Sequence, residues 1–146
     1  MDFAFECEPR VEGSSLPGAA GRAGHGSPSD RGQRFPRSLR LTARRQFLAT
    51  YSGGLRVRSA SFTLFGLRND AGHCRLGVTV TRKIGGAVVR NRVKRVVREI
   101  FRCRRADFDM PVDLVVNAHR SIVVREAREL EQELLSALQR LRRKLR

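Results

Sequence analysis

The sequence has no tryptophan and only one tyrosine among its 146 residues, so aliphatic residues and eight phenylalanines must build any core. Paired cysteines are also lacking, because Cys7, Cys74 and Cys103 lie far apart in the chain. Three scattered cysteines match neither a disulfide framework nor a zinc-binding motif. We therefore expect reduced thiols in a cytosolic protein.

Long apolar runs are absent as well. No run approaches the length of a membrane-spanning helix, and no charged start leads into an apolar block of the kind that signal peptides have. The length suits one domain with a single modest core. We expect a cytoplasmic location and no membrane partner.

Acidic residues are scarce in the middle of the chain. Residues 31–105 contain 20 basic residues and only two acids, Asp70 and Glu99, a net charge of +18 in a chain whose total is +16. Several carboxylates are needed to hold the ions of a protein-only metal nuclease, so we expect neither a catalytic residue nor a metal site on the polypeptide. A surplus of this size predicts a polyanionic partner, nucleic acid first.

Residues 1–34 are rich in Gly, Ser, Pro and Ala and contain few large apolar residues. Such a stretch cannot offset its ordering entropy by burial, so we predict a disordered extension. We favour a dispensable extension or a wrongly assigned start codon over a functional tail. The folded domain is predicted to span 35–146.

The first half of this domain predicts one short helix followed by strands. A helix is expected over 43–51 with Thr42 as its N-cap, a weak strand over 55–59, and stronger strands over 61–68 and 75–83. The two stronger strands flank the turn signal Asn-Asp-Ala-Gly, so we expect them to pair as an antiparallel hairpin.

The strand over 75–83 alternates between apolar and polar positions, which predicts one buried and one polar face. The apolar face contains Leu76, Val78 and Val80, and the polar face contains Gly77, Thr79 and Thr81.

The second half predicts two long amphipathic helices, 87–103 and 125–145, separated by a strand over 112–119. The expected fold class is α+β with the order α-β-β-β-α-β-α. Both long helices should pack on one face of a four-stranded sheet.

The helix over 87–103 has basic residues of one sign along its surface. Arg90, Lys94, Arg98 and Arg102 recur every fourth residue, in a stripe expected to lie opposite the buried valines. Like charges at this spacing destabilise an isolated helix by a few tenths of a kcal/mol per pair. A solvated face would contain both signs, as 125–145 does, so the stripe predicts contact with nucleic acid. Asn91 adds a neutral group that could reach a base, a ribose hydroxyl or a hydrated metal ion.

This helix and its flanks resemble the bacterial ribonuclease P protein family. The match is strongest in KIGGAVVRNRVKRVVREIFR (83–102), and FPRSLRLTARRQFLATYSGG, RLGVTVTRKIG and VDLVVNAHR resemble its N-terminal element, central strand and last strand. The resemblance covers about 35–142.

The resemblance implies the protein subunit of ribonuclease P, a ribonucleoprotein endonuclease that removes the 5′ leader from precursor tRNA. The RNA subunit performs the chemistry with Mg²⁺ that it mainly binds itself. The long helix would bind that RNA through Arg90, Asn91, Arg92, Lys94, Arg95 and Arg98. The first helix and the open sheet face would hold the leader at Phe47, Tyr51, Phe65, Thr79, Thr81 and Lys83.

The family fold also resembles the second domain of a small-subunit ribosomal protein, with a left-handed β-α-β crossover where the general rule favours a right-handed one. From the residues alone, Phe47 fits simple core packing better than nucleotide stacking, and Tyr51 fits the two equally well.

Two other functions are compatible with a basic α+β domain. One is a structural protein that binds ribosomal RNA, and the other is a DNA-binding regulator that uses 87–103 as its recognition helix. A strand rather than a short helix is predicted before residue 87, which disfavours a helix-turn-helix regulator.

Overall fold

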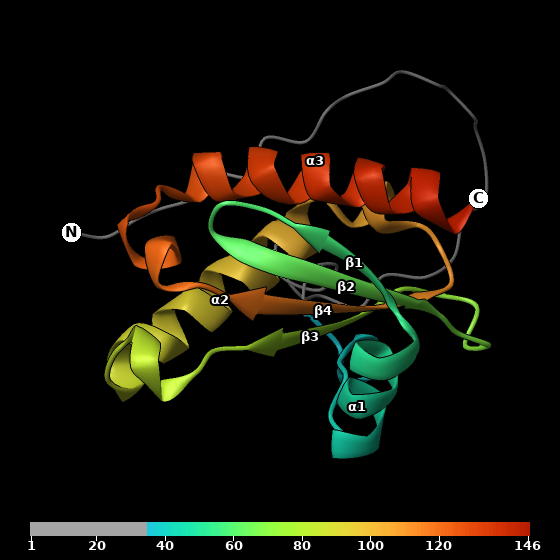
Figure 1. Cartoon of the computed structure of the whole chain (residues 1–146), viewed down its shortest axis with the longest axis horizontal. Coiled ribbons are helices and arrows are strands. Elements are labelled where there is room, and N and C mark those ends of the chain that lie inside the picture. The colour runs from blue at the N-terminus through green and yellow to red at the C-terminus, as the bar shows by residue number, and fades with distance from the viewer. Residues whose placement is uncertain (1–34) are drawn as a thin grey trace, which may run out of the picture. The chain divides into compact units, whose positions relative to one another are not determined.

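The computed structural model describes residues 35–146, in which three α-helices and four strands are joined by short 3₁₀ helices (Figure 1). The main elements are α1 (Arg44–Gly53), β1 (Leu55–Arg58), β2 (Phe62–Arg68), β3 (Arg75–Thr79), α2 (Ala87–Cys103), β4 (Val112–Ala118) and α3 (Ala127–Leu145). The 3₁₀ helices are η1 (Arg37–Leu39), η2 (Arg82–Ile84), η3 (Arg105–Phe108) and η4 (Arg120–Val124). The predicted α+β class and element order are confirmed.

The four strands form one mixed sheet in the order β1-β2-β4-β3. β2 pairs antiparallel with both β1 and β4, and β3 pairs parallel with β4. The predicted hairpin between 61–68 and 75–83 is therefore wrong, because β4 lies between these strands. Residues 112–116 of β4 are all buried, and a strand buried on both faces belongs in the middle of a sheet.

The parallel strands β3 and β4 are connected through α2, which makes the β-α-β unit that the family resemblance implied. The left-handed sense of this crossover stays a prediction.

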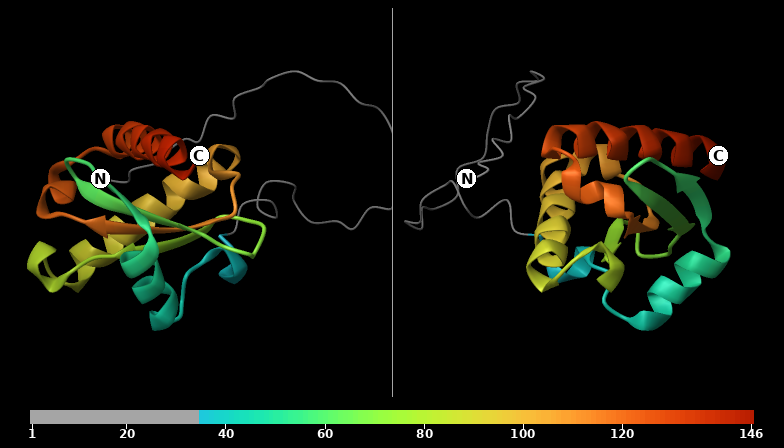
Figure 2. Two further views of the ribbon diagram at one scale, coloured as in Figure 1. Left: turned by 45° about the vertical axis from the view of Figure 1, so that its right-hand side comes forward. Right: turned by 60° about the vertical axis from the view of Figure 1, so that its left-hand side comes forward.

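α2 and α3 pack on one face of the sheet, as predicted, and α1 lies against the opposite face (Figure 2). We call the face under α1 the open face. The core under α2 and α3 combines Phe62, Leu64, Leu114 and Val116 from the strands with Val97, Ile100, Phe101, Leu134, Leu138 and Leu141 from the helices. Most of the leucines and valines predicted at helical spacing are in this core.

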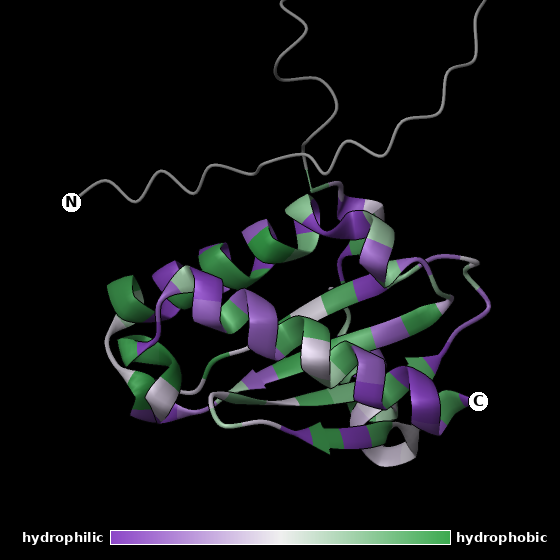
Figure 3. Ribbon diagram, turned by 90° about the horizontal axis from the view of Figure 1, so that it is seen from above, coloured by the Kyte–Doolittle hydropathy of each residue, from purple (hydrophilic) through white to green (hydrophobic). Residues whose placement is uncertain are grey.

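Gly66 allows α3 to pack closely on the sheet. A Cβ atom at this position would overlap the Leu141 side chain, so the missing side chain leaves room for the helix. Figure 3 shows α3 crossing over the strands, with hydrophilic and apolar residues alternating along α2 and α3.

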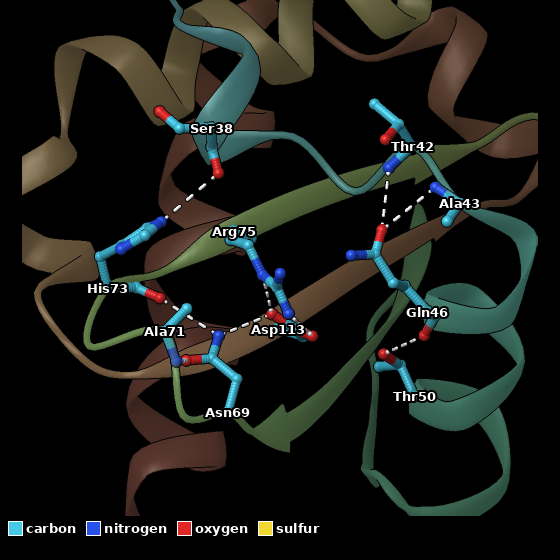
Figure 4. Close-up of polar contacts among 10 residues, drawn as sticks. All are labelled: Ser38, Thr42, Ala43, Gln46, Thr50, Asn69, Ala71, His73, Arg75 and Asp113. Carbon is cyan, nitrogen blue, oxygen red and sulfur yellow. Dashed lines mark hydrogen bonds and ion pairs between the residues drawn. The ribbon is translucent and has the colours of Figure 1, made fainter.

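Several element boundaries differ from the prediction by one or two residues, and the end of β3 differs by four. α1 begins at Arg44 with Ala43, not Thr42, as its N-cap, and the Gln46 side chain accepts hydrogen bonds from the backbone N–H groups of Thr42 (3.2 Å) and Ala43 (3.1 Å). Figure 4 shows these contacts at the start of α1. β3 ends at Thr79 rather than residue 83, because the chain turns into η2.

The extension predicted over 1–34 lies outside the described residues. Within 35–146, Cys74 and Cys103 are free thiols, as expected. Burial and, to a smaller extent, the negative charge of Asp113 raise the pKa of the Cys74 thiol to about 12. Among the described helices, none is long and apolar enough to cross a membrane.

Candidate nucleic-acid interface

The basic stripe of α2 borders the buried face of the helix. Val93 and Val97 are buried, and Arg90, Lys94 and Arg98 are half-buried beside them. The stripe therefore flanks the valines and does not stand opposite them as predicted. This placement lets the aliphatic stems cover core residues while the charged ends reach the surface. The remaining predicted residues Asn91, Arg92 and Arg95 are exposed.

The segment before α1 lies against this basic flank. The Phe35 ring meets Phe101 of α2 edge-on at 5.3 Å between centroids, and Arg40 lies over the Phe35 ring at 5.0 Å. Burial lowers the pKa of the Arg98 guanidinium, and the positive charge of Arg40 lowers it further. Arg40 therefore adds a cation to the flank, and an anionic ligand would relieve the repulsion between the two guanidiniums.

Arg90 begins this flank near the N-terminus of α2. Its Nε atom is buried and has no hydrogen-bond partner among the described residues. A buried donor without a partner typically costs about 1–3 kcal/mol.

Arg102, at the other end of the stripe, differs from the rest because it pairs with Glu99. The Arg102 Nε donates to Glu99 at 3.0 Å, and a second nitrogen also contacts the carboxylate. These hydrogen bonds lower the pKa of Glu99. One carboxylate thus offsets one cation at the C-terminal end, and the stripe's surplus lies over residues 90–98.

A second surface forms where α1 meets the open face. Phe47 lies over Gly77, where a Cβ atom would come within 2.5 Å of the ring. Tyr51 meets Phe65 edge-on at 4.8 Å between ring centroids, and its hydroxyl is hydrogen-bonded to Thr79 at 2.9 Å. The structure therefore brings together four of the six residues predicted for leader binding. All four are half-buried, so they are neither sealed in the core nor fully exposed.

The other two predicted residues, Thr81 and Lys83, lie beyond the end of β3 and are exposed. They belong to the segment around η2 that leads from the open face into α2. The open face and the basic flank are thus consecutive along the chain.

A row of four polar residues crosses the open face, and only one of them, Thr79, was predicted from the sequence as a binding residue. The strand register aligns Arg58, Thr63, Asn117 and Thr79 across all four strands. Thr63 is hydrogen-bonded to His119 at 2.9 Å. Alternation in 61–68 could have placed Thr63 beside Phe65. Asn117 could not be placed, because the predicted hairpin left no room for β4 between the two threonines.

An ion pair on the same face supports β3 and β4. Arg75 donates two hydrogen bonds of 2.7 Å to the buried Asp113 carboxylate, and Asn69 donates a third at 2.6 Å (Figure 4). The bonds to Asp113 raise the pKa of Arg75. This network ties the loop after β2 to the sheet, and its charges already neutralise each other. No three metal-binding side chains gather anywhere in 35–146.

Comparison with known proteins gives a consistent result. The family model described as Ribonuclease P matches residues 35–142. The ribonuclease P protein component of Desulfovibrio desulfuricans is 40% identical over 115 residues, which cover 76% of this chain and 88% of that protein. That of Syntrophus aciditrophicus is 44% identical over 82 residues, covering 56% of this chain and 69% of that protein.

Solved structures agree in fold. The ribonuclease P protein of Thermotoga maritima superposes with a TM-score of 0.65 at 32% identity, covering 69% of this chain and 96% of that one. The protein from Staphylococcus aureus superposes with a TM-score of 0.64 at 27% identity, covering 69% and 93% of the two chains.

Proposed function

The chain belongs to the ribonuclease P protein family, and on this basis we propose how its two surfaces serve the enzyme. It is the protein subunit of ribonuclease P, and it would assist the RNA subunit in the endonucleolytic removal of the 5′ leader from precursor tRNA. The basic flank of α2 would bind the RNA subunit, and the surface of α1 and the open face would bind the leader. The ribosomal alternative is not favoured by the comparisons.

The observation that carries the first assignment is the charge imbalance on α2. Arg90, Lys94 and Arg98 form one line beside the buried valines, and Asn91, Arg92 and Arg95 are exposed next to it. Each phosphate that these residues neutralise releases condensed counterions, which favours binding. Arginine adds two parallel donors that match a phosphate. Bound RNA would also lower the repulsion between Arg98 and Arg40.

The leader assignment rests on the half-buried aromatic residues. An unpaired nucleotide can stack on an aromatic ring, and such stacking contributes about 1–3 kcal/mol per base. Tyr51 contacts Phe65 and the hydroxyl of Thr79, and Phe47 lies over Gly77, two residues before Thr79 on β3. Thr81 and Lys83 extend this surface toward α2, so a strand bound there would run toward the RNA-binding flank.

The chemistry of cleavage is assigned to the RNA subunit in this proposal. Mg²⁺ bound mainly by that RNA would supply the activated water. The polypeptide side chains would neutralise phosphates and orient the substrate, and the exposed Asn91 amide could accept a hydrogen bond from a metal-bound water. The site of action would be the cytoplasm, where tRNA is processed.

Reconstitution tests this function directly. The full chain is mixed with a bacterial ribonuclease P RNA and precursor tRNA at low Mg²⁺, and 5′ maturation is measured with and without protein. We expect clear stimulation, because the protein compensates for the missing cations. A basic ribosomal protein at equal charge controls for non-specific screening. Equal stimulation by both proteins, or none by this chain, would contradict the proposal.

A further inference from the structure

A basic pocket lies apart from both surfaces described above. It has a volume of about 630 Å³ and is formed by the end of β2, the segment before β4 and the last turns of α3. We propose that this pocket binds the phosphate backbone of RNA, which would give the subunit a third contact with RNA. This inference rests on the proposed function.

Close packing of α3 on β2 builds the pocket. Leu141 packs against Gly66, which brings the C-terminal turns of the helix down onto the sheet. Arg68 at the end of β2 and Pro111 before β4 then face Arg142, Arg143 and Arg146 of the helix terminus across the pocket.

The arginine side chains are held in place without being neutralised. Arg68 donates to the backbone carbonyl of Leu145, and Arg142 donates to that of Asp107 at 2.8 Å. Both acceptors are neutral carbonyl oxygens. Within residues 35–146, no carboxylate forms an ion pair with Arg68, Arg142, Arg143 or Arg146.

The helix dipole does not account for this charge. A helix C-terminus carries roughly half a negative elementary charge, which one cation offsets. The lining residues contribute four guanidiniums and two carboxylates, those of the Asp109 side chain and of the C-terminal Arg146. A formal surplus of about 1.5 positive charges therefore remains even after the dipole is included.

RNA is the partner that fits this surplus best. Guanidinium groups bind phosphate oxygens through two parallel hydrogen bonds. RNA held by the basic flank of α2 would also present its own backbone to this small domain at a high effective concentration. An acidic peptide would have to come from a separate partner, and binding of poly-L-glutamate tests for it.

Substitutions on α3 test the pocket in the reconstituted holoenzyme. Arg143→Glu reverses one pocket charge, and Arg143→Lys keeps the charge. Arg128→Glu makes the same change in net charge at an exposed position of the same helix, outside the pocket. The Kd for the RNA subunit, the Kd of the holoenzyme for precursor tRNA and the Tm of each variant are measured across a range of salt.

We expect Arg143→Glu to weaken one of the two affinities roughly ten-fold, the effect of losing one charge-assisted hydrogen bond. The salt slope should fall by about one unit, and Arg143→Lys should recover most of the affinity. A loss for the RNA subunit alone would identify that RNA as the ligand, and a loss for precursor tRNA alone would identify the substrate.

Equal effects of Arg143→Glu and Arg128→Glu at unchanged Tm would overturn the pocket while leaving the proposed function intact. A different result would also overturn the proposal: the unaltered protein binds poly-L-glutamate, Arg143→Glu abolishes that binding, and both RNA affinities stay unchanged. The ligand of the pocket would then be an acidic peptide and not RNA. Failure of the unaltered protein to bind the RNA subunit would refute the proposed function. Because the unaltered protein is measured first, this failure is distinguished from a failure of the pocket proposal, which only the variants test.

Discussion

Gly77 shows how one missing side chain positions an aromatic ring. The Phe47 ring occupies the space that a Cβ atom at residue 77 would need, and Phe47 is half-buried on the open face. The sequence showed Phe47 one helical turn from Tyr51 but not what lay beneath it. From that spacing, core packing was favoured for Phe47 and was as good as nucleotide stacking for Tyr51. The half-burial of both rings is compatible with stacking.

Substitution of this glycine should displace the ring. In Gly77→Ala, the new Cβ would lie 2.5 Å from the present position of a Phe47 ring atom, so the ring must move outward. We expect destabilisation of about 1–3 kcal/mol, the usual cost of overpacking, and weaker binding of precursor tRNA. The matched control is Gly53→Ala, whose Cβ would make an ordinary contact of 3.6 Å with Leu67. Denaturant unfolding and precursor affinity that are the same in both variants would contradict this role of Gly77.

The two rings beside Thr79 give a second prediction at this scale. Tyr51→Ala or Phe65→Ala should weaken the holoenzyme's binding of precursor tRNA by about 1–3 kcal/mol through lost stacking, and should change mature tRNA binding much less. Only the precursor has a leader. Leu48→Ala on the exposed side of α1 is the control, since that side chain is 54% exposed. Equal losses for the two tRNAs would assign the rings to the core.

At the scale of elements, α2 and α3 differ in how their charges are arranged. α3 has its acids in the first half and basic residues in the last turns, in accord with its dipole. α2 has one acid, Glu99, which pairs with Arg102, so the cations over residues 90–98 have no acidic residue among them. The buried valines anchor this helix to the core, and its cations outnumber its single acid.

The charge of α2 predicts a steep salt dependence of RNA binding. Arg90→Ala or Arg92→Ala should lower the affinity for the RNA subunit and reduce the slope of log K against log salt by about one unit per lost phosphate contact. Arg128→Ala on the exposed side of α3 should leave the slope nearly unchanged. Filter-binding titrations at several salt concentrations provide the measurement, and a salt-insensitive interaction would exclude the phosphate contacts.

At the scale of the whole molecule, the β3–η2–α2 passage connects the two proposed RNA surfaces. Thr79 lies on the open face, Lys83 follows in η2, and Arg90 begins the basic flank. A leader and the RNA subunit could therefore be bound by neighbouring parts of one rigid domain. Because substrate and catalyst would be held close together, the protein could favour cleavage without supplying a reacting group.

The domain over 35–146 should be sufficient for this activity. Deleting residues 1–34 removes a segment of net charge −1, since its five acidic residues outnumber its four arginines by one. We expect the truncated protein to match the full chain in Tm and in stimulation of 5′ maturation within about two-fold, a difference near 0.4 kcal/mol. A large loss of activity at unchanged Tm would show that the extension has a function.

The sequence by itself determined the helices, the polar and apolar faces of β3 and the family. These depend on local periodicity and on a motif that is continuous in the chain, such as residues 83–102. Strand order was decided only by the tertiary structure, because β4 enters between β2 and β3 to bury both of its faces. The polar row with Asn117 and the pocket at Arg68 and Arg143 follow from that order. Each joins residues distant in sequence, whose proximity no local pattern records.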